Sequence, residues 1–162
     1  MADDWRAVAK KVRNWGNWGT DDQLGTLNYI TPQKIAQATT LPSQGKVFPL
    51  SIPIDAYGPQ GAHGFRRNPI HIMSVDGGDE QVAAVASDNI AVEVFASEFP
   101  DATLVFHLLV IRDMGMMLGE IWDLEALSQD CAADKTYAFL LVAQPLRVSG
   151  AVGSPVNPVA IK

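Results

Sequence analysis

The sequence predicts a mixed α/β fold in a single domain, because helical and strand patterns alternate along its 162 residues. Residues 4–13 place their apolar side chains at helical spacing. In residues 46–55, large apolar side chains alternate with proline, serine and valine, a period of two that is typical of a strand. Residues 137–145 (YAFLLVAQP) form a continuous apolar run, which predicts a central, buried strand.

Capping residues mark two further helices. Residues 31–39 open with Thr-Pro, an N-cap followed by the residue best suited to the first helical position. Residues 123–127 open with an aspartate that can cap a helical turn. Residues 104–112 are apolar nearly all round, so their pattern allows either a buried helix or a buried strand.

The remaining apolar segments predict short strands. Residues 82–86 are β-prone, and residues 116–118 form a second short apolar run. Residues 147–152 and 156–161 predict two edge segments, separated by glycine and proline. The strand at 46–55 contains two prolines, which cannot donate ladder hydrogen bonds, so we expect it at a sheet edge.

Residues 56–80 differ from the rest of the chain in composition and periodicity. They are rich in Gly, Pro and Asn and show no period. A connection of about 25 residues without secondary structure is unusual in a compact domain. We therefore expect this stretch to be functional, disordered or deprived of a packing partner.

Composition and charge exclude two classes of partner. The chain is 48% hydrophobic and 19% charged, as is usual for a globular protein. Its net charge is −6 and its basic residues are scattered, so it lacks the basic surface that nucleic acid requires. The longest apolar stretch, residues 102–111, is about half as long as a membrane-spanning helix. We expect no nucleic-acid partner and no membrane segment.

The single cysteine, Cys131, cannot form an internal disulfide, and residues 1–15 lack the apolar run of a signal peptide. We therefore expect a cytoplasmic protein. Acidic neighbours disfavour a Cys131 thiolate, so this residue is expected to be structural. The sequence contains no phosphate-binding loop, dinucleotide fingerprint or Gly-x-Ser-x-Gly elbow.

Metal chemistry is the remaining enzymatic option, and its candidate ligands are His107 and Glu120. His107 interrupts the apolar stretch LVFHLLVI, where an imidazole must be hydrogen-bonded or bound to a metal. It is therefore either a satisfied core histidine or a ligand. Glu120, between Gly119 and Ile121, is either an exposed turn carboxylate or a ligand. The two residues meet only if the chain reverses near Gly115, where glycine favours a reversal.

The other two histidines show no recognisable metal motif. His63 lies in a Gly-Ala-His-Gly loop, where a solvated side chain is the usual outcome. His71 precedes Asp76 and Asp79 at a spacing that matches no metal motif. Three histidines in all are a thin supply for a catalytic zinc site, which usually takes three protein ligands.

Two blocks of sequence carry a family resemblance. The first includes WGNWGTDDQLGTLNYITPQK and GKVFPLSIPID, and the second includes SDNIAVEVF, RDMGMMLGEIWDLEAL and FLLVAQPLRVSGAVGSPVNPVAIK. They resemble the cyclase family of metal-dependent hydrolases, which includes kynurenine formamidases of tryptophan catabolism and isatin hydrolases. The resemblance implies a mixed sheet of the swivelling β/β/α type, a divalent zinc or manganese ion, and an amide or lactam substrate. It also implies that His107 and Glu120 are metal ligands.

One part of the family pattern is absent from this sequence, the motif His-x-Gly-Thr-His-x-Asp-x-x-x-His. Residues 1–80 resemble the family's amino-terminal part and residues 81–162 its carboxyl-terminal part, with the junction near residues 79–82. By the resemblance, the missing motif supplies the other metal ligands and the acid–base histidine. We therefore expect an internally deleted hydrolase homologue, incomplete in fold and inactive as it stands.

A second hypothesis is a non-catalytic interaction or oligomerisation protein that pairs with an intact family member. By the resemblance, the missing segment would have carried central strands. The apolar residues 139–142 are then expected to be exposed or paired with another chain, and we expect a homo-oligomer.

Overall fold

The computed structural model describes residues 4–52, 81–94, 99–151 and 153–162. Its helices are α1 (Trp5–Val12), the 3-10 helix η1 (Gly25–Tyr29), α2 (Pro32–Ala38), α3 (Val105–His107), the π-helix η2 (Leu108–Asp113) and α4 (Glu125–Asp134). Its strands are β1 (Val47–Pro49), β2 (Ala84–Ala86), β3 (Met117–Gly119), β4 (Leu140–Val142) and β5 (Val159–Ile161). The predicted mixed α/β class is confirmed.

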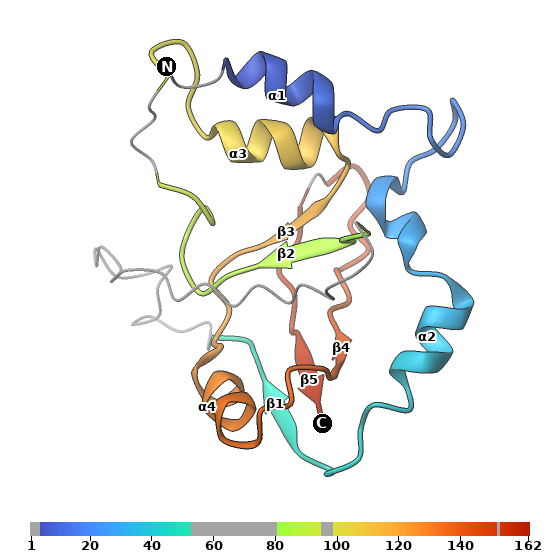
Figure 1. Ribbon diagram of the computed structural model, residues 1–162, viewed down its shortest axis with the longest axis vertical. Coiled ribbons are helices and arrows are strands. Elements are labelled where there is room, and N and C mark those ends of the chain that lie inside the picture. Colours follow the sequence, from blue (N-terminus) through green and yellow to red (C-terminus); the bar gives the residue numbers. More distant parts are fainter. Residues whose placement is uncertain (1–3, 53–80, 95–98, 152) are drawn as a thin grey trace.

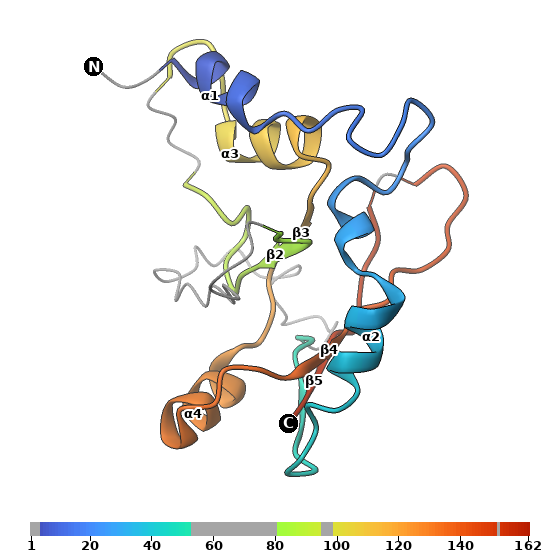
Figure 2. The same cartoon turned by 45° about the vertical axis from the view of Figure 1, so that its right-hand side comes forward.

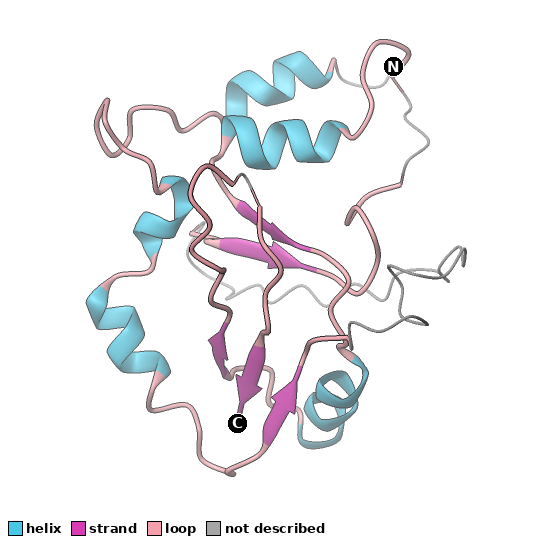
Figure 3. Cartoon of the chain, turned by 180° about the vertical axis from the view of Figure 1, so that it is seen from behind, coloured by secondary structure: helices cyan, strands magenta, loops and turns pink. Residues whose placement is uncertain are grey.

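The strands form two small sheets (Figure 1). β1, β5 and β4 pair in that order as an antiparallel sheet, and β2 pairs with β3 in parallel. The helix α1 lies beside the continuous α3 and η2 helix at one end of the molecule, and this pair stays together in the turned view of Figure 2. The three-stranded sheet and α4 lie at the other end, as Figure 3 shows from behind.

Side chains accept hydrogen bonds from backbone amides near the start of three helices, and the cap predicted at Thr31 is confirmed, whereas the N-cap of α4 is Leu124. The Asp4 side chain accepts a hydrogen bond of 3.1 Å from the Arg6 amide at the start of α1. Thr31 accepts one of 3.3 Å from the Lys34 amide, and Pro32 is the first residue of α2. Asp123 accepts a bond of 3.3 Å from the Glu125 amide, but α4 continues past the predicted end at residue 127.

Residues 104–112, which the sequence leaves open between helix and strand, belong to α3 and η2. A tertiary contact explains this outcome. The carboxylate of Glu93 accepts hydrogen bonds from the amides of Phe106, at 3.0 Å, and His107, at 2.8 Å. These are amide groups that a helix start leaves without partners. Since the cap comes from a distant residue, no local pattern reveals it.

The predicted order of the last two strands is wrong. Residues 137–145 are expected to form a central strand, but β4 covers only Leu140–Val142 and lies at the edge, where Leu141 is 44% exposed. Residues 156–161 are expected at an edge, but β5 is the central strand and its Ala160 is fully buried. An apolar run indicates burial of side chains, and it does not report which strand edges are paired.

Two further expectations have mixed outcomes. Residues 147–151 contain a turn at 149–150 and no strand. β1 does lie at the sheet edge, as its prolines predict, and the strand spans Val47–Pro49 within the described part of residues 46–55. Residues 53–80 lie outside the described residues, and with them the stretch predicted to lack structure. Among the described helices none has the length and apolar character needed to cross a membrane.

The hydrophobic core lies between the three-stranded sheet and α4. Its buried members are Leu50, Trp122, Leu127, Cys131 and Ala160. Cys131 is 4% exposed, in keeping with its predicted structural role.

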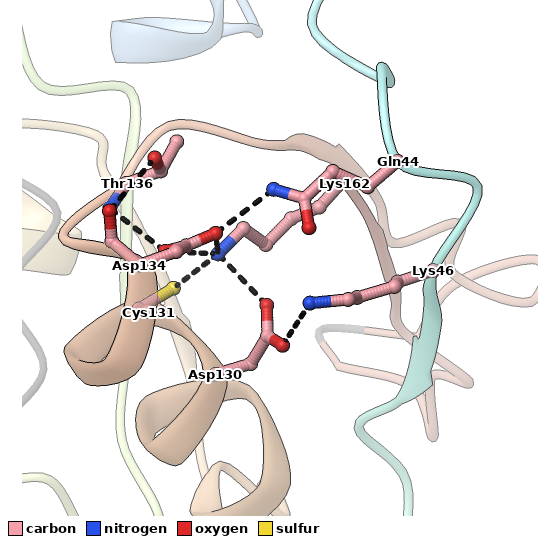
Figure 4. A network of polar contacts seen from close by, with 7 residues as sticks. All are labelled: Gln44, Lys46, Asp130, Cys131, Asp134, Thr136 and Lys162. Carbon is pink, nitrogen blue, oxygen red and sulfur yellow. Dashed lines mark hydrogen bonds and ion pairs between the residues drawn. The ribbon is translucent and has the colours of Figure 1, made fainter.

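A polar network ties α4 to the sheet beside this core (Figure 4). The buried ammonium of Lys162 lies 2.9 Å from a carboxylate oxygen of Asp130 and 2.9 Å from one of Asp134. Lys46 next to β1 also pairs with Asp130, and Gln44 donates a hydrogen bond of 2.8 Å to Asp134. Burial alone would lower the pKa of Lys162, but the two carboxylates outweigh it and raise the pKa. The lysine is therefore held as a cation.

Candidate functional site

His107 ends α3 with a carboxylate on each side of its imidazole ring. Its Nδ1 lies 2.7 Å from Oε1 of Glu93, and its Nε2 lies 3.1 Å from Oε1 of Glu120. The imidazole is mostly buried, and the carboxylate of Glu120 is the most exposed of the three groups, at 35%. The structure thus brings the two predicted site residues into contact.

The chain reversal predicted near Gly115 delivers Glu120 to His107. Gly115 adopts a left-handed conformation, with φ of 59°, between η2 and β3. Its carbonyl accepts a hydrogen bond of 3.1 Å from the Thr26 amide. A Cβ atom on the neighbouring Gly25 would lie 2.3 Å from that carbonyl oxygen, so only glycine fits there. The glycine-rich loop after α1 therefore supports the turn that positions the site.

Glu93 is the site residue that the sequence reasoning missed. One carboxylate oxygen contacts both the amide and Nδ1 of His107, so Glu93 fixes the start of the helix and the ring orientation together. An acid between Val92 and Val94 is the available signal. It is the same kind of signal that singles out His107, a polar residue inside an apolar run.

The two carboxylates set the charge of the imidazole. Burial alone would lower the pKa of His107, but hydrogen bonds with Glu93 and Glu120 outweigh it and raise the pKa above its usual value. The two carboxylates thus favour the protonated form of the ring, in which each ring nitrogen has a carboxylate within hydrogen-bond distance.

The donor types at this site fit zinc or manganese, but their number does not fit a catalytic ion. The 3.1 Å between Nε2 of His107 and Oε1 of Glu120 lets one ion bind both atoms at about 2.0–2.2 Å. Glu93 on Nδ1 is the carboxylate that commonly orients a metal-binding histidine. Within the described part of the chain, no three histidine, cysteine or acidic residues are grouped to hold a metal. His63 and His71 lie outside the described residues.

A large cavity of about 860 Å³ opens beside Glu120. Apolar side chains of several elements line it, including Leu24, Leu50, Met116 and Trp122. The indole nitrogen of Trp122 is buried without a hydrogen-bond partner among the described residues. The space is large enough for a small organic molecule next to Glu120.

The architecture is consistent with a cyclase-like α/β fold. The chain is similar to a solved structure described as a novel cyclase, with a TM-score of 0.71 and 27% sequence identity. The match covers 94% of this chain and 100% of the other. This likeness supports a relationship to the cyclase family. No family model and no curated protein matches the sequence.

Proposed function

We propose that this chain is a homologue of the metal-dependent amide and lactam hydrolases. It keeps two of the metal ligands, His107 and Glu120, and has lost the hydrolytic activity. The observation that carries the proposal is the orientation of His107, with Nδ1 held by Glu93 and Nε2 turned toward Glu120. A histidine whose second nitrogen is fixed by a carboxylate is the usual form of a metal-binding imidazole.

The backbone beside the two carboxylates supports a specialised site. Val92, next to Glu93, and Ile121, next to Glu120, have φ values of 58° and 63°. β-branched residues rarely adopt this left-handed conformation, which costs on the order of 1–3 kcal/mol per residue. Such strain clusters at functional sites. Here it flanks both partners of His107.

The missing ligands determine the expected activity. A bound zinc or manganese ion supplies an acidic water and polarises a carbonyl group in this class of enzyme. A catalytic zinc usually needs three protein ligands, and the motif that would supply the others is absent from the sequence. We therefore expect weak binding of metal ions and negligible hydrolysis.

The activity test uses N-formylkynurenine as the amide substrate. We expect the purified chain, with zinc or manganese added, to hydrolyse it no faster than the metal in buffer. A metal-dependent rate that is lost in the His107→Ala variant would contradict the inactive assignment. The substrate's absorbance change gives the rate directly.

A second candidate function is self-association, and the position of β4 at the edge of the described sheet favours it. Leu141 is 44% exposed and Val142 is 41% exposed on this edge strand. Unprotected apolar edges pair readily with another strand. We expect a homo-oligomer, measured by light scattering after gel filtration, that Val142→Lys dissociates while Val148→Lys, in the adjacent loop, does not. A monodisperse wild-type monomer that melts cooperatively would contradict it.

A further inference from the structure

A second pocket, of about 350 Å³, lies where α1 packs against η2. It shares no lining residue with the cavity beside Glu120, and neither His107 nor Glu120 lines it. Two indoles and four cationic side chains line it: Trp5, Trp15, Arg6, Lys10, Arg13 and Arg112.

This pocket is positively charged, whereas the chain as a whole is negatively charged. The lining contains no acidic residue, although the protein as a whole carries a net charge of −6. Arg13 and Arg112 share one carboxylate, that of Asp113, which is fully buried beneath them. Lys10 has no ion-pair partner among the residues that the structure describes. Arg6 is paired with Asp101 at 2.5 Å, so the excess positive charge of the pocket comes from Lys10 and from the single carboxylate that Arg13 and Arg112 share.

The shared carboxylate leaves donors free for a ligand. Arg13 and Arg112 each use Nε and Nη2 to bind Asp113. The remaining Nη1 group of each guanidinium makes no hydrogen bond within the described part of the chain. Since Asp113 holds both side chains in place, a ligand would not have to order them, and this lowers the entropic cost of binding.

Two indole rings, each lying against a guanidinium group, give the same pocket an apolar surface. The guanidinium carbon of Arg13 lies 4.2 Å from the centre of the Trp15 ring, and that of Arg6 lies 4.5 Å from the centre of the Trp5 ring. Trp5 is nearly buried, whereas Trp15 is 60% exposed. Planar guanidinium groups on indoles combine an apolar surface with fixed oxyanion donors.

We propose that this pocket binds a small aromatic oxyanion, a molecule with one planar ring and a carboxylate or phosphate group. The cationic side chains match the oxyanion, because guanidinium and ammonium groups form charge-assisted hydrogen bonds with it. The guanidinium groups that lie over the indoles present planar faces, which match the planar ring. The volume suits a one-ring molecule and is at the small end of the range for ligand sites.

The test follows the four indole N–H signals of the protein by nuclear magnetic resonance during titration with benzoate. We expect the signals of Trp5 and Trp15 to shift, while those of Trp18 and Trp122, outside the pocket, stay in place. Benzamide, which has no charge, and acetate, which has no ring, should bind at least several-fold more weakly. Phenyl phosphate in place of benzoate shows which oxyanion the pocket prefers.

Two matched variants locate the binding. Lys10→Ala removes the unpaired cation and should weaken benzoate binding about fivefold, the effect of losing one exposed ion pair. Lys11→Ala makes the same change of charge on the same helix outside the pocket and should leave the affinity unchanged. Both lysines are exposed in α1, so both variants should fold. Equal binding of benzoate and benzamide, equal effects of the two variants, or no shift at Trp5 and Trp15 would each overturn the proposal.

Discussion

At the scale of single residues, the central feature is the pair of contacts that Glu93 makes with His107. The Glu93 carboxylate accepts a hydrogen bond from the backbone amide of His107 and also contacts its Nδ1. The start of the helix and the orientation of the ring therefore depend on one carboxylate. His107 and Glu120 could be singled out from the sequence because each polar group stands among apolar neighbours. Glu93 could not be assigned to His107 in this way, because a cap that comes from 14 residues away leaves no local spacing to recognise.

The Glu93→Gln variant tests this orienting role. The amide oxygen can still accept from the helix start, but it holds the ring more weakly than a carboxylate does. We expect zinc affinity, measured by competition with a chromophoric chelator, to fall at least about tenfold. Glu125→Gln, at the start of α4, is the control and should leave the affinity unchanged. An unchanged affinity in Glu93→Gln would exclude an orienting role for Glu93.

At the scale of elements, α1 is fastened to η2 by ionic and backbone contacts. Asp113 at the end of η2 accepts two hydrogen bonds from Arg13, at 3.0 and 2.8 Å. Trp15 donates its indole N–H to the Arg112 carbonyl at 2.8 Å. The helix α1 itself could be predicted from its period. Its docking partner could not, because the contacts span about 100 residues of sequence.

The pKa of Asp113 makes this docking dependent on pH. Burial would raise the pKa, but hydrogen bonds from Arg112 and Arg13 outweigh it and lower the pKa below its usual value of about 4. A lowered pKa means that the contribution to stability is complete above about pH 4 and is lost as the pH falls through the folded-state pKa.

The Asp113→Asn variant should therefore lose about 2 kcal/mol of stability at neutral pH, because two partly exposed arginines lose their charged hydrogen-bond partner. Its free energy of unfolding should also fall less steeply than that of the wild type below about pH 4. Urea unfolding at a series of pH values measures both effects. Asp21→Asn, in the exposed loop after α1, is the control. A variant with the same pH dependence as the wild type would show that Asp113 does not carry the effect.

At the scale of the whole molecule, the α/β class and most of the elements follow from periodicity and capping, but the order of the strands does not. Ala160 of β5 pairs with Phe48 on one side and Leu141 on the other. Nothing in the short segment Val159–Ile161 distinguishes a central strand from an edge strand. Strand order is decided by packing against α4 and Trp122, which are distant in the sequence.

In the proposed function, His107 and Glu120 form one side of a metal centre. Paramagnetic broadening by manganese, followed in the amide spectrum of the intact chain, tests this claim most directly. We predict that low manganese concentrations broaden the signals of residues around His107 and Glu120 first, and that Glu120→Gln abolishes this effect. Broadening centred on the Asp130 and Asp134 pair, or unchanged broadening around His107 in Glu120→Gln, would contradict the account.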